Sequence, residues 1–232
     1  MPEIKICGIT NTRDALAAAE FGANAVGFIF FKKSPRYVPP ERARRIISHV
    51  PPDVACVGVF VNRDIPDVLE IADHCRLDMF QFHGNESPAY CRSFPTAATI
   101  KAFAPRCEAD LVLLKDYRVR ALLTDTYDPA RYGGTGKTSD WGLAAQLTAD
   151  YPLILSGGLN TSNVCRALDA VFPDAVDINS GIENRPGHKN HVELRNIIEL
   201  VRQRSRLPKD TTTKIFSCRR RHGELHYERC TQ

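Results

Sequence analysis

Short runs of apolar residues, many of them β-branched or aromatic, recur along the whole chain. They show no clear alternation of polar and apolar positions, which is typical of strands covered on both faces in a parallel sheet. We expect eight strands, at residues 4–7, 25–30, 54–60, 79–82, 99–103, 121–124, 153–155 and 176–178. Their starts lie 20 to 32 residues apart. That interval fits one strand followed by one helix.

The segments between these runs carry helix start and stop signals. Asn11 precedes an alanine-rich stretch that closes near Gly22, Pro39 and Pro40 open a second stretch, and Asn163 precedes a third with apolar positions at helical spacing. Strands that alternate with helices of this length form right-handed βαβ units. Eight such units predict the α/β class and a single (β/α)8 TIM barrel over residues 1–207, with an open doubly wound sheet as the alternative.

The last part of the chain, residues 208–232, shows neither period. It holds six Lys or Arg residues against three Asp or Glu residues, which accounts for most of the net charge of +4. We expect a basic, poorly ordered C-terminal extension, or alternatively a basic interaction tail. Because eight units already close a barrel, the extension is expected to bury no core. Truncation after Leu207 should then leave the melting temperature within a few degrees.

The composition narrows the class of protein further. With 43% apolar and 25% charged residues, the chain resembles an ordinary globular protein. The apolar runs are far shorter than the ~20 residues that cross a bilayer, and the first residues have no signal-peptide pattern, so we expect a cytoplasmic protein without a membrane partner. The nearly neutral body predicts no nucleic-acid partner. The eight scattered cysteines lack a Cys-x-x-Cys pair, which favours reduced thiols and no metal site.

In a barrel of this kind, functional groups gather at the carboxyl ends of the strands. Cys7 and Asp125 stand at the ends of the first and sixth runs and form a candidate proton-transfer pair. A buried structural cysteine and a helix-capping aspartate are the alternatives. A thiol with a pKa of ~8.5 needs a lowered pKa to act as a base. Lys5 lies on the same strand and is expected to point the same way as Cys7.

Glycines after the seventh and eighth runs indicate a phosphate site. Gly157 and Gly158, together with Ser180 and Gly181, expose backbone amides where this fold frequently binds an anion. Tight turns are the alternative for such glycines. A further glycine-rich run at 133–138 fails as a nucleotide-binding P-loop because Arg131 replaces the first glycine. It is interpreted as a loop over the active site, or as a plain surface loop.

Seven ordered motifs within residues 1–206 resemble the phosphoribosylanthranilate isomerase family of tryptophan biosynthesis. They are Lys5-Ile-Cys-Gly-Ile-Thr10, Gly27-Phe-Ile-Phe30 with Ser34-Pro-Arg-Tyr-Val38, Val57-Gly-Val-Phe-Val-Asn62, Gln81-Phe-His-Gly84, Gly133-Gly-Thr-Gly-Lys137, Leu155-Ser-Gly-Gly-Leu159 and residues 176–189. The resemblance implies a barrel that performs an Amadori rearrangement of N-(5-phosphoribosyl)anthranilate without a cofactor. The family motifs near residue 180 usually carry Ser at position 179, where this chain has Asn179.

The resemblance also implies roles for individual residues. It assigns Cys7 as general base, Asp125 as general acid, Arg36 to the anthranilate carboxylate and the two glycine pairs to the phosphate. His83 and Asp177 are expected to contact the substrate. The implied partner is a small phosphoribosyl compound, and the protein is expected to be a monomer or a homodimer. A related histidine-pathway isomerase, which uses two aspartates, and a barrel scaffold without catalysis remain alternatives.

Overall fold

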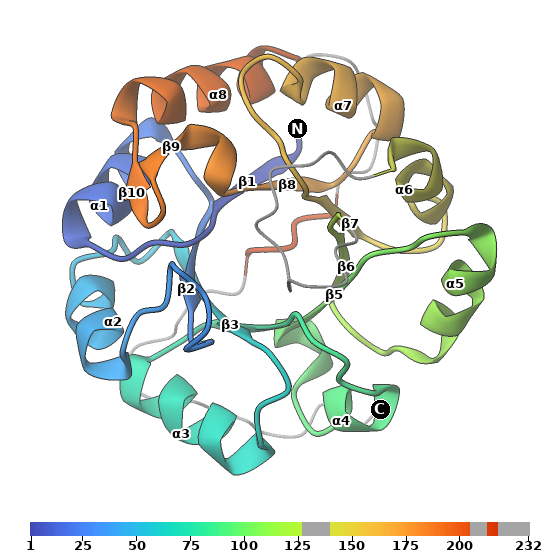
Figure 1. Ribbon diagram of the computed structural model, residues 1–232, viewed down its shortest axis with the longest axis horizontal. Coiled ribbons are helices and arrows are strands. Elements are labelled where there is room, and N and C mark those ends of the chain that lie inside the picture. The colour runs from blue at the N-terminus through green and yellow to red at the C-terminus, as the bar shows by residue number, and fades with distance from the viewer. Residues whose placement is uncertain (127–139, 205–212, 218–232) are drawn as a thin grey trace.

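Eight parallel strands form a closed barrel in the computed structural model, which describes residues 1–126, 140–204 and 213–217 (Figure 1). The strands pair in chain order, and β8 returns to β1. They are β1 (Glu3–Ile6), β2 (Ala25–Ile29), β3 (Ala55–Phe60), β4 (Met79–Phe82), β5 (Thr99–Phe103), β6 (Ala121–Thr124), β7 (Leu153–Leu155) and β8 (Ala175–Ile178). Each overlaps the run predicted from its apolar residues, so the barrel prediction is confirmed.

Helices surround the barrel in one outer ring (Figure 1). They are α1 (Thr12–Phe21), α2 (Pro40–Ile47), α3 (Ile65–Cys75), α4 (Pro88–Cys91), α5 (Glu108–Val112), α6 (Trp141–Leu147), α7 (Val164–Val171) and α8 (His191–Arg204), with 3-10 turns η1 (Thr96–Ala98), η2 (Leu113–Asp116) and η3 (Ser180–Ile182). The predicted signals at α1 are confirmed: the Asn11 side chain accepts a hydrogen bond from the Asp14 amide, and Gly22 adopts a left-handed φ of 102°. Pro39 and Asn163 precede α2 and α7 as expected.

The strands separate two apolar layers, because alternate side chains point to opposite faces. On β3, Cys56 and Phe60 face the helices, and Ala55 and Val57 face the barrel interior. The outer layer is large and aromatic. The interior cluster is built from small and medium residues, including five alanines. Among the described residues no helix combines the length and the apolar character needed to cross a membrane.

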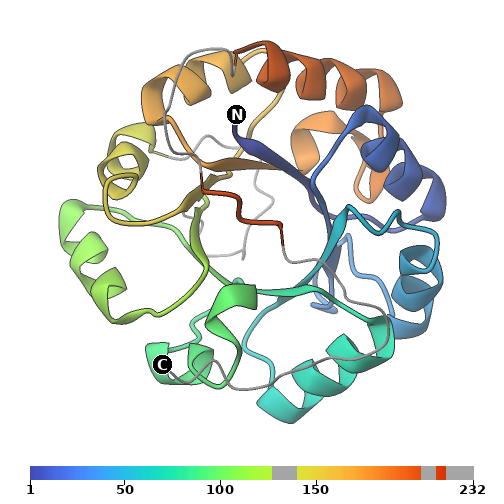
Figure 2. The same cartoon turned by 180° about the vertical axis from the view of Figure 1, so that it is seen from behind.

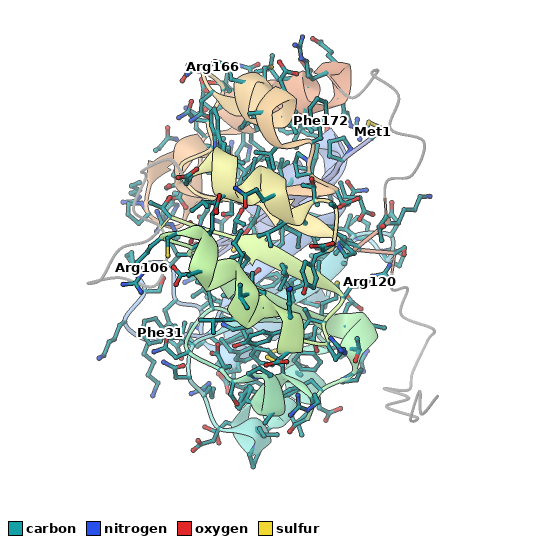
Figure 3. The ribbon with its side chains drawn as sticks, turned by 90° about the vertical axis from the view of Figure 1, so that its right-hand side faces the viewer. Met1, Phe31, Arg106, Arg120, Arg166 and Phe172 are labelled. Atoms are coloured by element: carbon teal, nitrogen blue, oxygen red, sulfur yellow. The ribbon has the colours of Figure 1, made fainter. Side chains whose placement is uncertain are left out.

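The two ends of the barrel differ in what they carry, and Figure 3 shows them from the side. Phe31 and Arg106, which follow β2 and β5, lie on the left of that view, at the carboxyl ends of the strands. Met1 and Arg120, which precede β1 and β6, lie on the right. Most of the predicted site residues closely follow a strand, so they lie at the carboxyl end of the barrel, on the left in Figure 3.

Residues 213–217, which we call the plug segment, close the amino end of the barrel (Figure 2). Ile215 and Phe216 are 0% and 4% exposed and belong to the interior cluster. The carboxylate of Glu3 accepts hydrogen bonds from both of their amides, with Phe216 N at 2.9 Å, and Asp174 Oδ1 accepts from Thr213 N at 3.1 Å.

The expectation that the C-terminal extension buries no core is therefore wrong for the plug segment. The physical reason lies in the small side chains of the interior cluster. Ala25, Ala55 and Ala175 contribute only methyl groups to it, which leaves room for an aromatic ring from elsewhere in the chain. The rest of the predicted extension, residues 208–212 and 218–232, lies outside the described residues.

A small antiparallel hairpin after β8 has no counterpart among the predicted elements. It consists of β9 (Glu183–Arg185) and β10 (His188–Lys189) and follows η3. The amide of Lys189 donates to Asp14 Oδ2 at 2.9 Å, which ties the hairpin to α1. These strands are too short and too polar to produce a periodic signal. They nevertheless bring Glu183 and Lys189 to the carboxyl end of the barrel.

Candidate active site

A buried ion pair lies inside the barrel where β1 meets β8. Lys5 and Asp177 are direct cross-strand neighbours, and Lys5 Nζ lies 2.9 Å from Asp177 Oδ2, with the two side chains 0% and 4% exposed. Burial lowers the pKa of Lys5, but the Asp177 carboxylate and the neighbouring Cys7 sulfur outweigh it and raise that pKa. Lys5 is therefore a permanent cation at neutral pH.

Cys7 follows β1 directly and is held there by a hydrogen bond from its amide to Ile178 O, at 2.9 Å. A Cβ atom on Gly27 would lie 2.8 Å from Cys7 Sγ and 3.1 Å from Lys5 Nζ. The missing side chain of Gly27 thus makes room for both groups, and the expectation that Lys5 and Cys7 point the same way is confirmed.

The charge environment of the Cys7 thiol contains opposing contributions. Burial raises its pKa and the Asp177 carboxylate acts in the same direction, whereas Lys5 and Lys189 lower it, and the net direction is upward. The condition stated for a thiol base, a pKa below its ordinary value, is not met in the free protein. Burial of the thiol and the Asp177 carboxylate together outweigh the two cations, a balance that sequence reasoning could not determine.

Asp125 stands at the end of β6, three strands from β1 around the closed barrel and therefore across its mouth from Cys7. Its Oδ2 lies 3.0 Å from His83 Nε2, and its Oδ1 accepts from the Thr126 amide at 2.7 Å. His83 Nδ1 in turn lies 2.9 Å from Gln81 Nε2. With the Gln81 amide donating to Nδ1, His83 Nε2 carries the proton of the hydrogen bond to Asp125.

Arg36, on the loop between β2 and α2, is buried and faces the β9–β10 hairpin. Its Nε donates to both carboxylate oxygens of Glu183 at 3.0 Å, and its Nη2 donates to Glu183 Oε2 at 2.7 Å. Lys189 Nζ approaches Glu183 Oε1 to 3.0 Å. Although burial acts the other way, Arg36 and Lys189 hold the pKa of Glu183 below its usual value. Glu183 therefore remains an anion that orients the Arg36 guanidinium.

The two predicted glycine pairs meet at the ends of β7 and β8. Gly157 and Gly158 have left-handed φ values of 94° and 62°, conformations that favour glycine. A Cβ on Gly181 would lie 2.0 Å from the Leu159 carbonyl oxygen, so the loop that carries Ser180 packs directly on the loop before α7. The structure thus brings both pairs together beside the amino end of a helix, as an anion site requires.

Sequence reasoning missed the partners that orient the expected groups. Glu183 and Lys189 were not singled out, and the local signal for them was only their place directly after β8. Asp177 pairs with Lys5, and its expected contact with the substrate stays a prediction. The sequence did contain a signal for the Lys5–Asp177 pair. Each partner is a charged residue within an apolar run, and the two runs become neighbouring strands when the barrel closes. The glycine-rich run 133–138 lies outside the described residues. Among the described residues, Cys7, Cys75, Cys91, Cys107 and Cys165 are free thiols.

Known proteins with the same sequence pattern share one activity. The family model described as N-(5'-phosphoribosyl)anthranilate (PRA) isomerase matches residues 4–200. An N-(5'-phosphoribosyl)anthranilate isomerase of Syntrophus aciditrophicus is 52% identical over 203 residues, which cover 88% of this chain and 88% of that protein. One from Citrifermentans bemidjiense is 48% identical and covers 85% of this chain and 96% of its own.

Solved structures agree with these relatives. The phosphoribosyl anthranilate isomerase of Thermotoga maritima superposes with a TM-score of 0.79 at 40% identity, covering 88% of this chain and 100% of its own. A structure of such an isomerase in complex with reduced 1-(o-carboxyphenylamino)-1-deoxyribulose 5-phosphate gives a TM-score of 0.76 at 39% identity, with the same coverage. The chain belongs to the N-(5'-phosphoribosyl)anthranilate isomerase family, and it is an isomerase of tryptophan biosynthesis.

Proposed function

We propose that Cys7 and Asp125 carry out the Amadori rearrangement of N-(5-phosphoribosyl)anthranilate to 1-(2-carboxyphenylamino)-1-deoxyribulose 5-phosphate. The observation that carries the proposal is the placement of a thiol and a carboxyl on facing sides of one barrel mouth. A ribose bound between them would present its ring oxygen to one group and its C2 hydrogen to the other. A relative at 39% identity binds the reduced product analogue, which supports a phosphoribosyl substrate for this site.

In the first step Asp125 gives a proton to the furanose oxygen, and the C1–O bond breaks. The nitrogen lone pair forms the C1=N bond, so a cationic Schiff base results. The carboxylate that Asp125 becomes in this step accepts the 3.0 Å hydrogen bond from His83 Nε2, which stabilises its negative charge. His83 thereby acts on Asp125, and Gln81 fixes the orientation of its ring.

In the second step Cys7 removes the C2 proton of the Schiff base. The electrons of that C–H bond form the C1–C2 double bond of an enolamine, and the nitrogen becomes neutral. The enolamine then tautomerises to the ketone. The cationic nitrogen makes C2–H acidic and adds positive charge near Cys7, which favours the thiolate in the complex over the free protein.

Binding is assigned to groups at opposite ends of the substrate. Glu183 occupies the Nε and Nη2 edge of Arg36, so the Nη1 edge of the guanidinium can receive the anthranilate carboxylate in a second bidentate pair. The amides of Gly157, Gly158, Ser180 and Gly181 are proposed to bind the phosphate, supported by the contact between their two loops.

The oligomeric state stays a prediction: the protein is a monomer or a homodimer. Sedimentation velocity distinguishes the two.

Steady-state kinetics with N-(5-phosphoribosyl)anthranilate generated in situ test these roles. We expect Cys7→Ala and Asp125→Asn each to lower kcat by at least ~10²-fold, the lower end for a positioned acid or base. Cys56→Ala is the matched control, since Cys56 is equally buried but faces the helix layer, and its kcat should stay near that of the wild type. A Cys7→Ala protein with normal kcat would refute the mechanism.

A further inference from the structure

We propose that Lys5 is a positioning residue for Cys7: its ammonium group stabilises the Cys7 thiolate, and Asp177 holds that ammonium in place. The inference deepens the proposed function and rests on it for its catalytic meaning. A lysine completely enclosed in a barrel, such as Lys5, is unusual, because burial of its charge is costly and requires a charged or hydrogen-bonded partner. A functional role explains why such a costly residue is found there. Its ion pair with Asp177 supplies the partner, and its place beside Cys7 supplies the reason.

The geometry places the ammonium next to the sulfur. Lys5 Nζ and Cys7 Sγ both lie about 3 Å from one point above Gly27, at 3.1 and 2.8 Å. Both side chains leave β1 toward the interior, and both groups are almost fully buried. In such surroundings a cation and an anion at close range interact far more strongly than in water. A thiolate at position 7 therefore has a counter-ion already in position.

Other charged groups around Cys7 must be weighed together with Lys5. From β8 Asp177 opposes the thiolate, from β10 Lys189 favours it, and β2 contributes only Gly27 at this point. Lys189 is itself engaged by Glu183 at 3.0 Å and by the Asn179 side-chain and backbone oxygens at 3.0 and 3.1 Å. Its charge is thus largely directed to the hairpin. Of the two cations, Lys5 lowers the Cys7 pKa more.

Asp177 has two effects that oppose each other, and they make the inference testable. It raises the pKa of Lys5, which keeps the ammonium charged when Cys7 titrates. It also repels the thiolate. Removal of Lys5 leaves Cys7 beside an unpaired carboxylate, whereas removal of the Asp177 charge leaves the thiolate as the natural counter-ion of Lys5. The two members of one ion pair should therefore shift the Cys7 pKa in opposite directions.

The test measures the alkylation rate of Cys7 by iodoacetamide against pH, read by mass spectrometry on the peptide that contains residue 7. The rate follows the thiolate fraction. At pH 8 we expect Lys5→Met to slow alkylation of Cys7 at least about tenfold, and Asp177→Asn to accelerate it, as removal of a neighbouring charge predicts. Exposed Cys107 in the same samples is the internal reference and should react at one rate in all variants.

A second variant controls for the loss of any buried ion pair. Lys101 is also buried, but on the helix-facing side of β5, and it pairs with Glu86 at 3.1 Å, so Lys101→Met should leave the Cys7 titration unchanged. In turnover, the limb of the kcat/KM pH profile that reports the Cys7 titration should move to higher pH in Lys5→Met and to lower pH in Asp177→Asn. Shifts of the Cys7 titration in the same direction in both variants, or none in Lys5→Met, would overturn the inference.

These outcomes are separable from failure of the proposed function. If Cys7→Ala retains normal turnover, Cys7 is not the base, yet the alkylation profiles still report whether Lys5 acts on its thiol. If Cys7→Ala is inactive but Lys5→Met alkylates like the wild type, the base is correct and the positioning role of Lys5 is wrong. Should Lys5→Met fail to fold, the Asp177→Asn profile alone decides the sign.

Discussion

Replacement of Phe216 by alanine tests whether the plug segment contributes to stability. A phenylalanine in a core that cannot rearrange loses ~3–5 kcal/mol on truncation to alanine. The plug segment, however, is short and lies near the end of the chain, so it can detach from the barrel. The loss in unfolding free energy is then limited to the free energy with which the segment docks.

That docking free energy can be estimated from the contacts. Burial of Ile215 and Phe216, which are 0% and 4% exposed, contributes ~3–6 kcal/mol at ~1.5–3 for each large apolar side chain. Two amide hydrogen bonds to the Glu3 carboxylate add ~3–6 kcal/mol at ~1.5–3 each. Ordering the backbone of the segment costs ~5–10 kcal/mol at ~1–2 per residue. With all contributions at their lower ends the balance is ~1 kcal/mol, and with all at their upper ends it is ~2 kcal/mol, in favour of docking.

We therefore expect Phe216→Ala to lower the free energy of unfolding by ~1–2 kcal/mol and the melting temperature by roughly 3–6 °C for a chain of this size. Truncation after Leu207 should give the same loss, because both changes abolish docking. Urea denaturation followed by circular dichroism measures it. Ser217→Ala is the matched control, because Ser217 is exposed on the same segment, and it should change neither quantity.

Glu3 holds the plug segment through its carboxylate, so its replacement should also release the segment. In the truncated protein Glu3→Gln should have little additional effect, whereas in the full chain it should reproduce most of the loss, because the mutations act through one contact. Equal stability of the wild type, Phe216→Ala and the truncated chain would show that the plug segment does not dock in solution. A loss of ~4 kcal/mol in Phe216→Ala alone would show that it cannot detach.

Three further predictions concern the mouth of the barrel. Arg36→Met should raise KM and leave kcat nearly unchanged, because its contact exists in the ground and transition states alike; a loss in kcat alone would contradict this. Inorganic phosphate should compete with substrate in the wild type, and Gly158→Val should abolish the competition, since Gly158 has a left-handed φ of 62°. Glu183 has a lowered pKa, so its contribution to stability is present above the unfolded value of ~4.5 and is lost as pH falls through the folded value. Urea midpoints between pH 6 and 3 should therefore fall less steeply in Glu183→Gln than in the wild type.

The barrel was predictable because its information is local. Each strand is a short run whose residues are buried on both faces, and each helix begins or ends at residues such as Asn11 or Gly22 that act within one turn. The catalytic candidates Cys7 and Asp125 were found by the same rule, since chemistry in this fold collects after the strands. Their roles then came from the family resemblance rather than from spacing.

The parts that escaped prediction depend on closure of the barrel. The Lys5–Asp177 pair joins residues on the first and last strands, and the plug segment returns from beyond α8 to Glu3 at the start of the chain. The pattern of apolar and polar residues along the chain does not predict contacts between residues that are far apart in the sequence. The raised pKa of Cys7 escaped for the same reason, because burial and the charges of Asp177, Lys5 and Lys189 determine it together.

A second buried ion pair lies outside the barrel interior, on the helix-facing side of β5, and its position clarifies the first. Lys101 Nζ contacts Glu86 and also donates to the carbonyl oxygens of Phe82 and Gly84, at 3.2 and 2.7 Å, the residues on either side of His83. Buried ion pairs are poor sources of stability, because apolar side chains of the same volume often do as well or better. One pair adjoins the thiol proposed as base, and the other fixes the backbone that carries His83, the partner of Asp125. A buried lysine thus acts beside Cys7 directly and at Asp125 only through the backbone around His83, which explains why the Lys101→Met control should disturb the Asp125 side of the mouth and leave the Cys7 titration unchanged.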